Sequence, residues 1–156
     1  MSFLLAQDAL NGKSGKAFAT IDGRNVELFG LKKFESNAEF EDAKFSVVGS
    51  RVTQHKPKEM NISGTATIYY GTPEFIKIAH QYQATGKFPE ITFQVTNEDA
   101  STSVGTQTVA YYGVVLSKIP LSLLDESAEF LEEEISWSAS SFEPLSYFNT
   151  PTNLGS

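Results

Sequence analysis

The segment FLEEEISWSAS, residues 130–140, admits two secondary structures, and the choice between them decides the fold. Residues 127–134 have good helix propensity, so a helix is one interpretation. In a strand, successive side chains point to opposite faces of the sheet. One face would then carry Leu131, Glu133, Ile135, Trp137 and Ala139, and the other Phe130, Glu132, Glu134, Ser136, Ser138 and Ser140. The strand accounts for the tryptophan and the serines together, and we therefore predict a strand.

The consecutive glutamates suggest an acid–base pair, but the surrounding sequence does not support one. Glu132 and Glu134 would lie ~6–7 Å apart on one strand face, in the range of glycosidase carboxylates. Their side chains would point in parallel, however, and nothing in the sequence supplies a sugar-binding cleft. The favoured interpretation is a solvated polar face.

No other motif predicts a catalytic, cofactor or metal site. His55 and His80 fit no metal-ligand spacing, and the absence of cysteine excludes thiolate ligands. The segment NGKSGK, residues 11–16, lacks the first glycine of a phosphate-binding loop. We expect no enzyme activity and no cofactor.

The charges of the chain are segregated. Nineteen acidic and twelve basic residues give a net charge of −7. Six acids fall within residues 125–134, and no lysine or arginine follows Lys118. Residues 44–58 contain no acid and carry Lys44, Arg51, Lys56 and Lys58. An acidic C-terminal third does not suit phosphate binding, whereas opposite charges in separate segments suit self-association.

Apolar patterning predicts a mainly β chain with one α-helix. Alternation predicts strands over or within residues 18–21, 26–29, 61–71, 89–99 and 106–119. Asp22-Gly23 predicts a tight turn between the first two, and residues 30–45 are read as an extension of the second. Residues 72–86 predict the helix, with Thr72 as N-cap and Gly86 just past its end.

The length fits a single domain over residues 1–156. Within it we expect an N-terminal arm over residues 1–10, a long basic loop over 44–58 and a flexible tail over 149–156. No segment reaches the ~18 apolar residues of a membrane helix and no signal peptide is recognised, so no membrane anchoring is expected. The lack of cysteine fits a reducing cytoplasm.

Several short motifs, taken together, resemble a known family. They are Phe34-Glu35 with Asn37 and Glu39; Gly49, Arg51, Thr53, His55 and Lys56; Gly64 to Thr67 with Tyr69; and Leu131 to Glu134. In order and spacing they resemble the tail tube proteins of contractile phages and phage-tail-like bacteriocins, of the PBSX-prophage type. The resemblance runs from about Leu10 to Phe148. Ser50 and Gln54 depart from the family pattern, which often has a basic residue and a glycine there.

The resemblance implies a β-sandwich or barrel-like protomer with a flanking helix. Such protomers form hexameric rings that stack into a hollow tube, with strands from all subunits closing a continuous inner β-barrel. The implied partners are a sheath protein, a tape-measure protein, and baseplate and tail-terminator proteins, with non-specific passage of DNA if the particle is a phage. The implied location is a virion tail or tail-like particle assembled in the bacterial cytoplasm.

Two sets of residues gain expected roles from this resemblance. An acidic or hydroxylated lining of the tube would repel a polyanion, and the candidates are Glu132, Glu134, Ser136, Ser138 and Ser140 with Thr92, Gln94 and Thr96. The alternative is that this face looks outward. The candidates for contacts between rings are Arg51, His55, Lys56 and Lys58, opposite the acids of residues 125–134. We expect the loop over 44–58 to be mobile in a free subunit.

Two alternative functions remain at this stage. The tube of a secretion-type contractile machine would share the fold without passing DNA. A monomeric carbohydrate-binding β-sandwich would fit the composition, but it would normally expose aromatic side chains on one sheet face, whereas Trp137 alternates with core residues.

Overall fold

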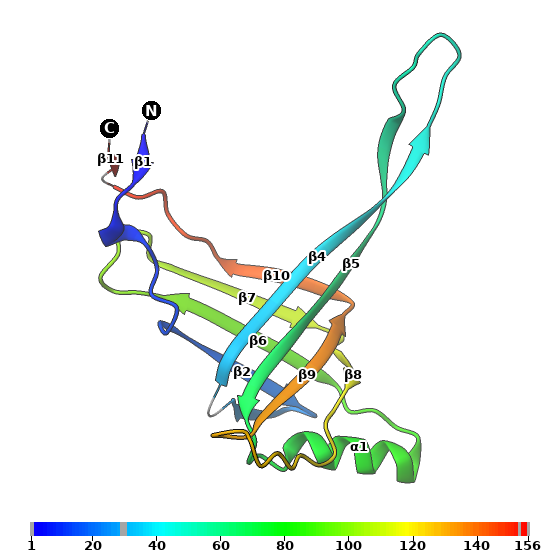
Figure 1. Ribbon diagram of the computed structural model, residues 1–156, viewed down its shortest axis with the longest axis vertical. Coiled ribbons are helices and arrows are strands. Elements are labelled where there is room, and N and C mark those ends of the chain that lie inside the picture. Colours follow the sequence, from blue (N-terminus) through cyan, green and yellow to red (C-terminus); the bar gives the residue numbers. More distant parts are fainter. Residues whose placement is uncertain (1, 29–30, 153, 156) are drawn as a thin grey trace. The chain divides into compact units, whose positions relative to one another are not determined.

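The computed structural model describes residues 2–28, 31–152 and 154–155 and divides the chain into two compact units. Unit 1 contains Met1–Phe29, Pro89–Val114 and Ser141–Ser156, and unit 2 contains Gly30–Phe88 and Val115–Ser140. The predicted single domain therefore consists of two units whose segments alternate along the chain. The fold class is confirmed, because the described elements are mainly strands with one α-helix (Figure 1).

Unit 1 is built on a five-stranded antiparallel sheet with the order β10-β7-β6-β2-β3. Its strands are β2 (Gly15–Ile21), β3 (Arg24–Glu27), β6 (Ile91–Glu98), β7 (Thr106–Tyr112) and β10 (Ser141–Ser146). The predicted turn between β2 and β3 is confirmed, since Asp22 and Gly23 adopt φ angles of 50° and 81°. Alternate residues such as Ala19, Ile91 and Phe93 are buried, as the strand period requires.

The two ends of the chain meet in unit 1. Strand β1 (Phe3–Leu4) pairs with β11 (Leu154–Gly155), and a short 3-10 helix, η1 (Ala6–Asp8), follows β1. The buried Asp8 carboxylate accepts hydrogen bonds from the backbone N–H and the hydroxyl of Ser103. The backbone N–H of Asn149 donates to the carbonyl of Val104 at 2.7 Å. The tail that was expected to be flexible is thus held by hydrogen bonds at its described residues.

Unit 2 is built on a four-stranded antiparallel sheet with the order β4-β5-β9-β8. Its strands are β4 (Leu31–Phe45), β5 (Gln54–Tyr69), β8 (Val115–Lys118) and β9 (Glu132–Ala139). Strand β9 confirms the strand prediction for residues 130–140 and makes the helix interpretation wrong. Its faces also divide as predicted, because Glu133, Ile135 and Trp137 are buried and Glu132, Glu134 and Ser138 are exposed.

A glycine makes room for the tryptophan of β9. Gly64 of β5 lies directly opposite Trp137, and a Cβ atom on this glycine would lie only 2.6 Å from the indole ring. The Phe34 ring of β4 lies 5.5 Å from the indole, centroid to centroid. The small residues noted on one face of β5 thus have a packing reason, because they accommodate the largest buried side chain.

The helix of unit 2, α1, spans Glu74–Thr85. Thr72 Oγ1 accepts from the N–H of Glu74, and Gly86 closes the other end in the left-handed conformation with its N–H on the carbonyl of Tyr82. The predicted helix is therefore confirmed, beginning after Pro73. In the part of the chain that the structure describes, no helix is long and apolar enough to cross a membrane.

Two predicted strand extensions are wrong. The strand predicted over 106–119 is interrupted at Gly113, which has a φ of 64°, and its halves β7 and β8 belong to different sheets. Residues 31–45 do not continue β3, because they form β4 in the sheet of unit 2.

The predicted long loop over 44–58 is also too long. Lys44 and Phe45 close β4, Gln54 to Lys58 open β5, and the connecting loop covers only 46–53. Direct backbone pairing explains the difference, since Lys44 lies opposite His55 and Phe45 opposite Gln54. Main-chain hydrogen bonds form these strands without any apolar alternation.

Candidate functional site

One face of the unit 2 sheet is lined by hydroxyl and charged side chains. In the register of the sheet, Thr65 of β5 lies between Glu35 of β4 and Ser136 of β9, and Lys118 of β8 lies beyond Ser136. The next row holds Asn37, Ser63 and Ser138, and Thr67 lies opposite Glu134. The structure therefore brings Glu134, Ser136 and Ser138 together with polar residues of β4 and β5. We call this surface the hydroxyl face.

The carboxylates on and beside the hydroxyl face have basic or amide partners. Lys33 Nζ lies 3.2 Å from a Glu35 carboxylate oxygen, and Asn37 also donates to Glu35. The hydrogen bond from Lys33, followed by that from Asn37, lowers the pKa of Glu35. At the end of the sheet Lys32 donates to Glu132, and this hydrogen bond raises the pKa of Lys32. The face is thus hydroxylated and close to charge-balanced rather than strongly acidic.

The three consecutive glutamates have three different environments. Glu132 is ion-paired with Lys32, and Glu134 lies exposed opposite Thr67. Glu133 is only 2% exposed, opposite Ile68, and its Oε2 has no hydrogen-bond partner in the described part of the chain. Burial raises the pKa of Glu133. Sequence alternation placed Glu133 on the buried side, but it gave no reason for a carboxyl group there.

The other predicted lining residues lie in the unit 1 sheet. Thr92, Gln94 and Thr96 follow one another on one face of β6, and Thr96 Oγ1 lies 3.1 Å from Thr108 Oγ1. The predicted lining set is therefore divided between two sheets.

The unit 2 sheet has two open edges. Strands β4 and β8 are its edge strands, and neither pairs with a further strand within residues 2–28, 31–152 and 154–155. Strand β4 is 15 residues long, which is a long row of backbone donors and acceptors to leave without strand partners. Such an edge is suited to pairing with another chain.

Strands β4 and β5 continue beyond the rest of the sheet as a two-stranded arm (Figure 1). Pairing of β5 with β9 ends at Ile62, and residues 39–61 beyond this point are defined here as the arm. All of its side chains are exposed, including the apolar Phe40, Phe45, Val48, Val52 and Met60. An isolated hairpin is marginally stable in water, so the arm lacks the packing that usually supports one.

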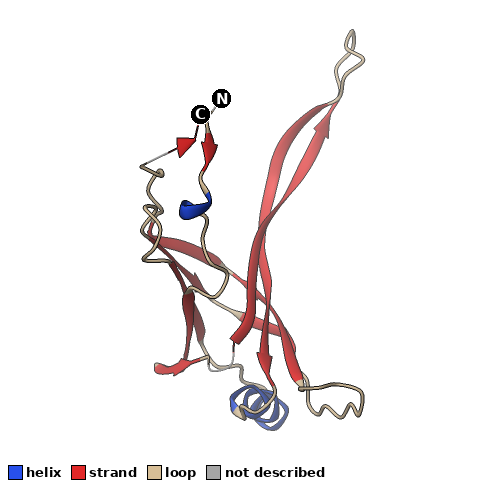
Figure 2. Cartoon of the chain, turned by 60° about the vertical axis from the view of Figure 1, so that its left-hand side comes forward, coloured by secondary structure: helices blue, strands red, loops and turns tan. Residues whose placement is uncertain are grey.

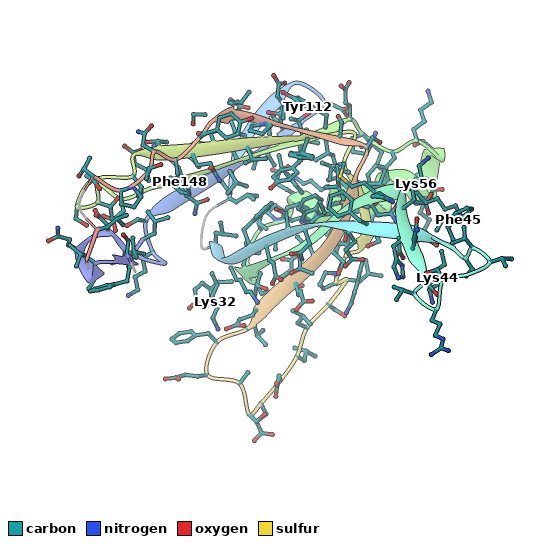
Figure 3. All side chains as sticks on the ribbon, turned by 90° about the horizontal axis from the view of Figure 1, so that it is seen from above. Lys32, Lys44, Phe45, Lys56, Tyr112 and Phe148 are labelled. Carbon is teal, nitrogen blue, oxygen red and sulfur yellow. The ribbon has the colours of Figure 1, made fainter. Side chains whose placement is uncertain are left out.

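The predicted contact residues all lie on the arm. Arg51 is in the loop at its tip, and His55, Lys56 and Lys58 are in β5. Lys44, Phe45 and Lys56 are labelled near the tip in Figure 3. His55 Nδ1 lies 2.6 Å from Asp42, so this histidine already has a partner within the arm. Sequence reasoning missed Asp42, because the pairing depends on the register of the hairpin.

The acid-rich segment over 125–134 is also divided. Its second half is strand β9, and its first half belongs to a loop over residues 119–131 that we call the acidic loop. The loop carries Asp125, Glu126 and Glu129 and surrounds a hollow of about 520 Å³. The lining of the hollow is partly apolar and consists of Leu123, Leu124, Asp125, Ala128, Phe130, Leu131 and Glu132.

The arrangement offers surfaces for association rather than a centre for chemistry. Among the described residues, no group of three or more His, Asp or Glu side chains is placed to hold a metal ion. The features that stand out are open strand edges, an uncovered arm and a hydroxyl face.

Comparison with known proteins agrees with this description. Residues 2–146 match the family described as phage tail tube protein. The chain belongs to the phage tail tube family. It is 34% identical over 140 residues to the phage-like element PBSX protein XkdM of Bacillus subtilis (strain 168), covering 90% of this chain and 92% of that protein. It is 36% identical, with the same coverage, to the uncharacterized protein YqbM of the same strain.

The fold of this tail tube protein is also similar to that of a solved assembly. A chain of the sheath-tube complex of an extracellular contractile injection system, PVC, in its extended state superposes with a TM-score of 0.64 at 10% identity. The match covers 88% of this chain and 92% of that chain. The resemblance inferred from the sequence motifs is thereby confirmed, and so is the structural role in a tail tube.

Proposed function

We propose that this chain assembles as hexameric rings that stack into the inner tube of a contractile phage tail or tail-like bacteriocin. Membership of the tail tube family gives the structural role, and the observation that supports the assembly is the pair of open edges of the unit 2 sheet. Pairing of β4 in one copy with β8 in the next would extend the sheet around a ring. Closure of the ring would leave no sheet edge open.

The hydroxyl face is the proposed lining of the tube. Ser136, Ser138 and Thr65 offer neutral hydroxyls, while the charges of Glu35 and Glu132 are offset by lysines. A lining of this kind has little attraction for phosphates, because affinity for a nucleic acid backbone comes from uncompensated Lys and Arg. A charged polymer would therefore pass along it without being held.

The proposed partners follow from the same role. A sheath protein would surround the tube, as the sheath-tube complex of the PVC system is named for such an arrangement. A tape-measure protein, a baseplate and a tail-terminator protein would contact the lumen or the ends of the tube. The proposed role is mechanical, without an enzyme activity, in a virion tail or tail-like particle assembled in the bacterial cytoplasm.

Electron microscopy of the purified protein tests the assembly. We expect rings or tubes at high protein concentration, with six-fold symmetry in averaged end views and Ser136 and Ser138 facing the lumen. A protein that stays monomeric at every concentration would contradict the assembly. Tubes with the hydroxyl face outside would contradict the lining.

Hydrogen exchange tests the role of the arm. We expect backbone amides of residues 39–61 to exchange at least tenfold more slowly in tubes than in free subunits, because the arm has no cover within its own chain. Residues 62–69 of β5, which pair on both sides, provide the internal control and should be protected in both states. Equal strong protection of the arm in free subunits and tubes would show that it needs no partner.

A further inference from the structure

The arm tip and the acidic loop lie at opposite ends of unit 2. Strand β4 starts where Leu31 faces Ile68, beside the pair of Tyr69 and Glu132 that follows the acidic loop. It ends at the tip, where Phe45 faces Gln54. At roughly 3.3 Å per residue, its 15 residues span about 45–50 Å. The tip of one chain therefore cannot reach its own acidic loop (Figure 2).

The arm tip combines positive charge with exposed apolar side chains. No acid occurs between Ala43 and Lys58, and the nearby Asp42 is already paired with His55. Lys44, Arg51 and Lys56 carry the charge. At the turn Val48 is fully exposed and Val52 is 75% exposed. An apolar, basic projection of this kind favours an apolar site with an acidic rim.

The acidic loop has the complementary character. No base occurs from Ile119 to Leu131, and Leu124 and Phe130 are 98% and 69% exposed beside the hollow of about 520 Å³. Hydrogen bonds from Ser127 to the Asp125 carboxylate hold the turn and lower the pKa of Asp125, which favours its charged form. Glu126 and Glu129 are also exposed.

We propose that the arm tip of one copy docks in the acidic loop of a second copy, with Val48 and Val52 against Leu124 and Phe130. The basic residues of the tip then lie against Asp125, Glu126 and Glu129. Because the two surfaces lie at opposite ends of unit 2, the contact is head to tail and repeats from copy to copy. The inference rests on the proposed tube, in which it joins successive rings and gives the stack its polarity.

Disulfide trapping tests the contact directly, because the chain has no native cysteine. The double variant Val48→Cys with Leu124→Cys should give a ladder of covalent oligomers after mild oxidation, resolved on a non-reducing gel. The control pairs Val48→Cys with His80→Cys, an exposed position on α1, and should give no such ladder. A double variant that forms no more oligomer than the control overturns the proposal.

Charge exchange provides a second, independent test. Arg51→Glu with Lys56→Glu, or Glu126→Lys with Glu129→Lys, should slow tube growth at least tenfold in light scattering. Combining all four substitutions should restore growth to within about threefold of wild type. Lys13→Glu with Lys16→Glu, on exposed residues of unit 1, gives the same change in net charge as the arm variant and should assemble normally. Circular dichroism establishes that each variant is folded.

The outcomes separate this proposal from the proposed function. If wild type forms tubes but the arm variant grows as fast, or the combined variant grows no faster than either parent, the docking is wrong and the tube stands. If wild type forms no tubes but the cysteine ladder appears, the head-to-tail contact stands and the tube fails.

Discussion

Replacing Trp137 with alanine is expected to lower the free energy of unfolding by about 3–5 kcal/mol. Trp137 is 1% exposed, packs against Phe34 and fills the space left by Gly64 opposite it. Truncation would leave a cavity that the pleated strands around it cannot close, because their spacing is fixed by backbone hydrogen bonds. Urea unfolding of the subunit at low concentration, followed by far-ultraviolet circular dichroism, measures the loss.

Tyr147→Ala provides the matched control for this prediction. It removes an aromatic ring that is 70% exposed, and its cost should stay within about 0.5 kcal/mol. Trp137→Phe should lie between the two, since a smaller ring still contacts Phe34. A loss below about 1 kcal/mol for Trp137→Ala would mean that the indole is not the centre of this packing.

The stretch around Trp137 was predictable because one of its faces is buried. Ile135 and Trp137 are inside, and Ser136 and Ser138 face the other way, so the period of two appears in the sequence itself. The helix was predictable for a similar reason, since Thr72 and Gly86 bracket it and Phe75 and Ile78 form its buried stripe.

The arm was not predictable by the same reasoning. Both faces of residues 39–61 are exposed, so no hydrophobic period marks the strands, and Pro57 favoured a loop. The register shows how the proline is accommodated, because Glu41 lies opposite Glu59 while Asp42 lies opposite Pro57, which leaves Lys58 in a bulge. Backbone pairing across a hairpin is a property of two segments together, and neither segment reveals it alone.

The candidate site was predictable in its composition but not in its pairings. Alternation assigned Glu134, Ser136 and Ser138 to one face, and the sheet confirms that assignment. The ion pair of Lys32 with Glu132 joins residues 100 positions apart, and it depends on an irregularity in β4 between Leu31 and Lys33. The lining consequently carries less net charge than the run of glutamates suggested.

The buried carboxyl of Glu133 is expected to make the subunit less stable as pH rises. Burial disfavours the charged form, so the pKa of Glu133 is higher in the folded chain than in the unfolded chain. The folded state therefore binds more protons between the ordinary glutamate value of about 4.3 and the raised pKa. Stability is highest below this window and falls as pH rises through it, with the full penalty present above the raised pKa.

Removing this carboxyl should therefore stabilise the chain at neutral pH. Glu133→Leu replaces an oxygen that has no hydrogen-bond partner among the described residues with an apolar group opposite Ile68, and we expect a gain of about 1–3 kcal/mol at pH 7. Glu133→Gln keeps the shape and removes the charge, so its advantage over wild type should be small near pH 4 and grow toward pH 7. Urea unfolding across this pH range measures both variants, with Glu134→Gln on the exposed face as the control. An advantage of Glu133→Gln that does not change with pH would mean that the Glu133 carboxyl is as well solvated in the folded chain as in the unfolded one.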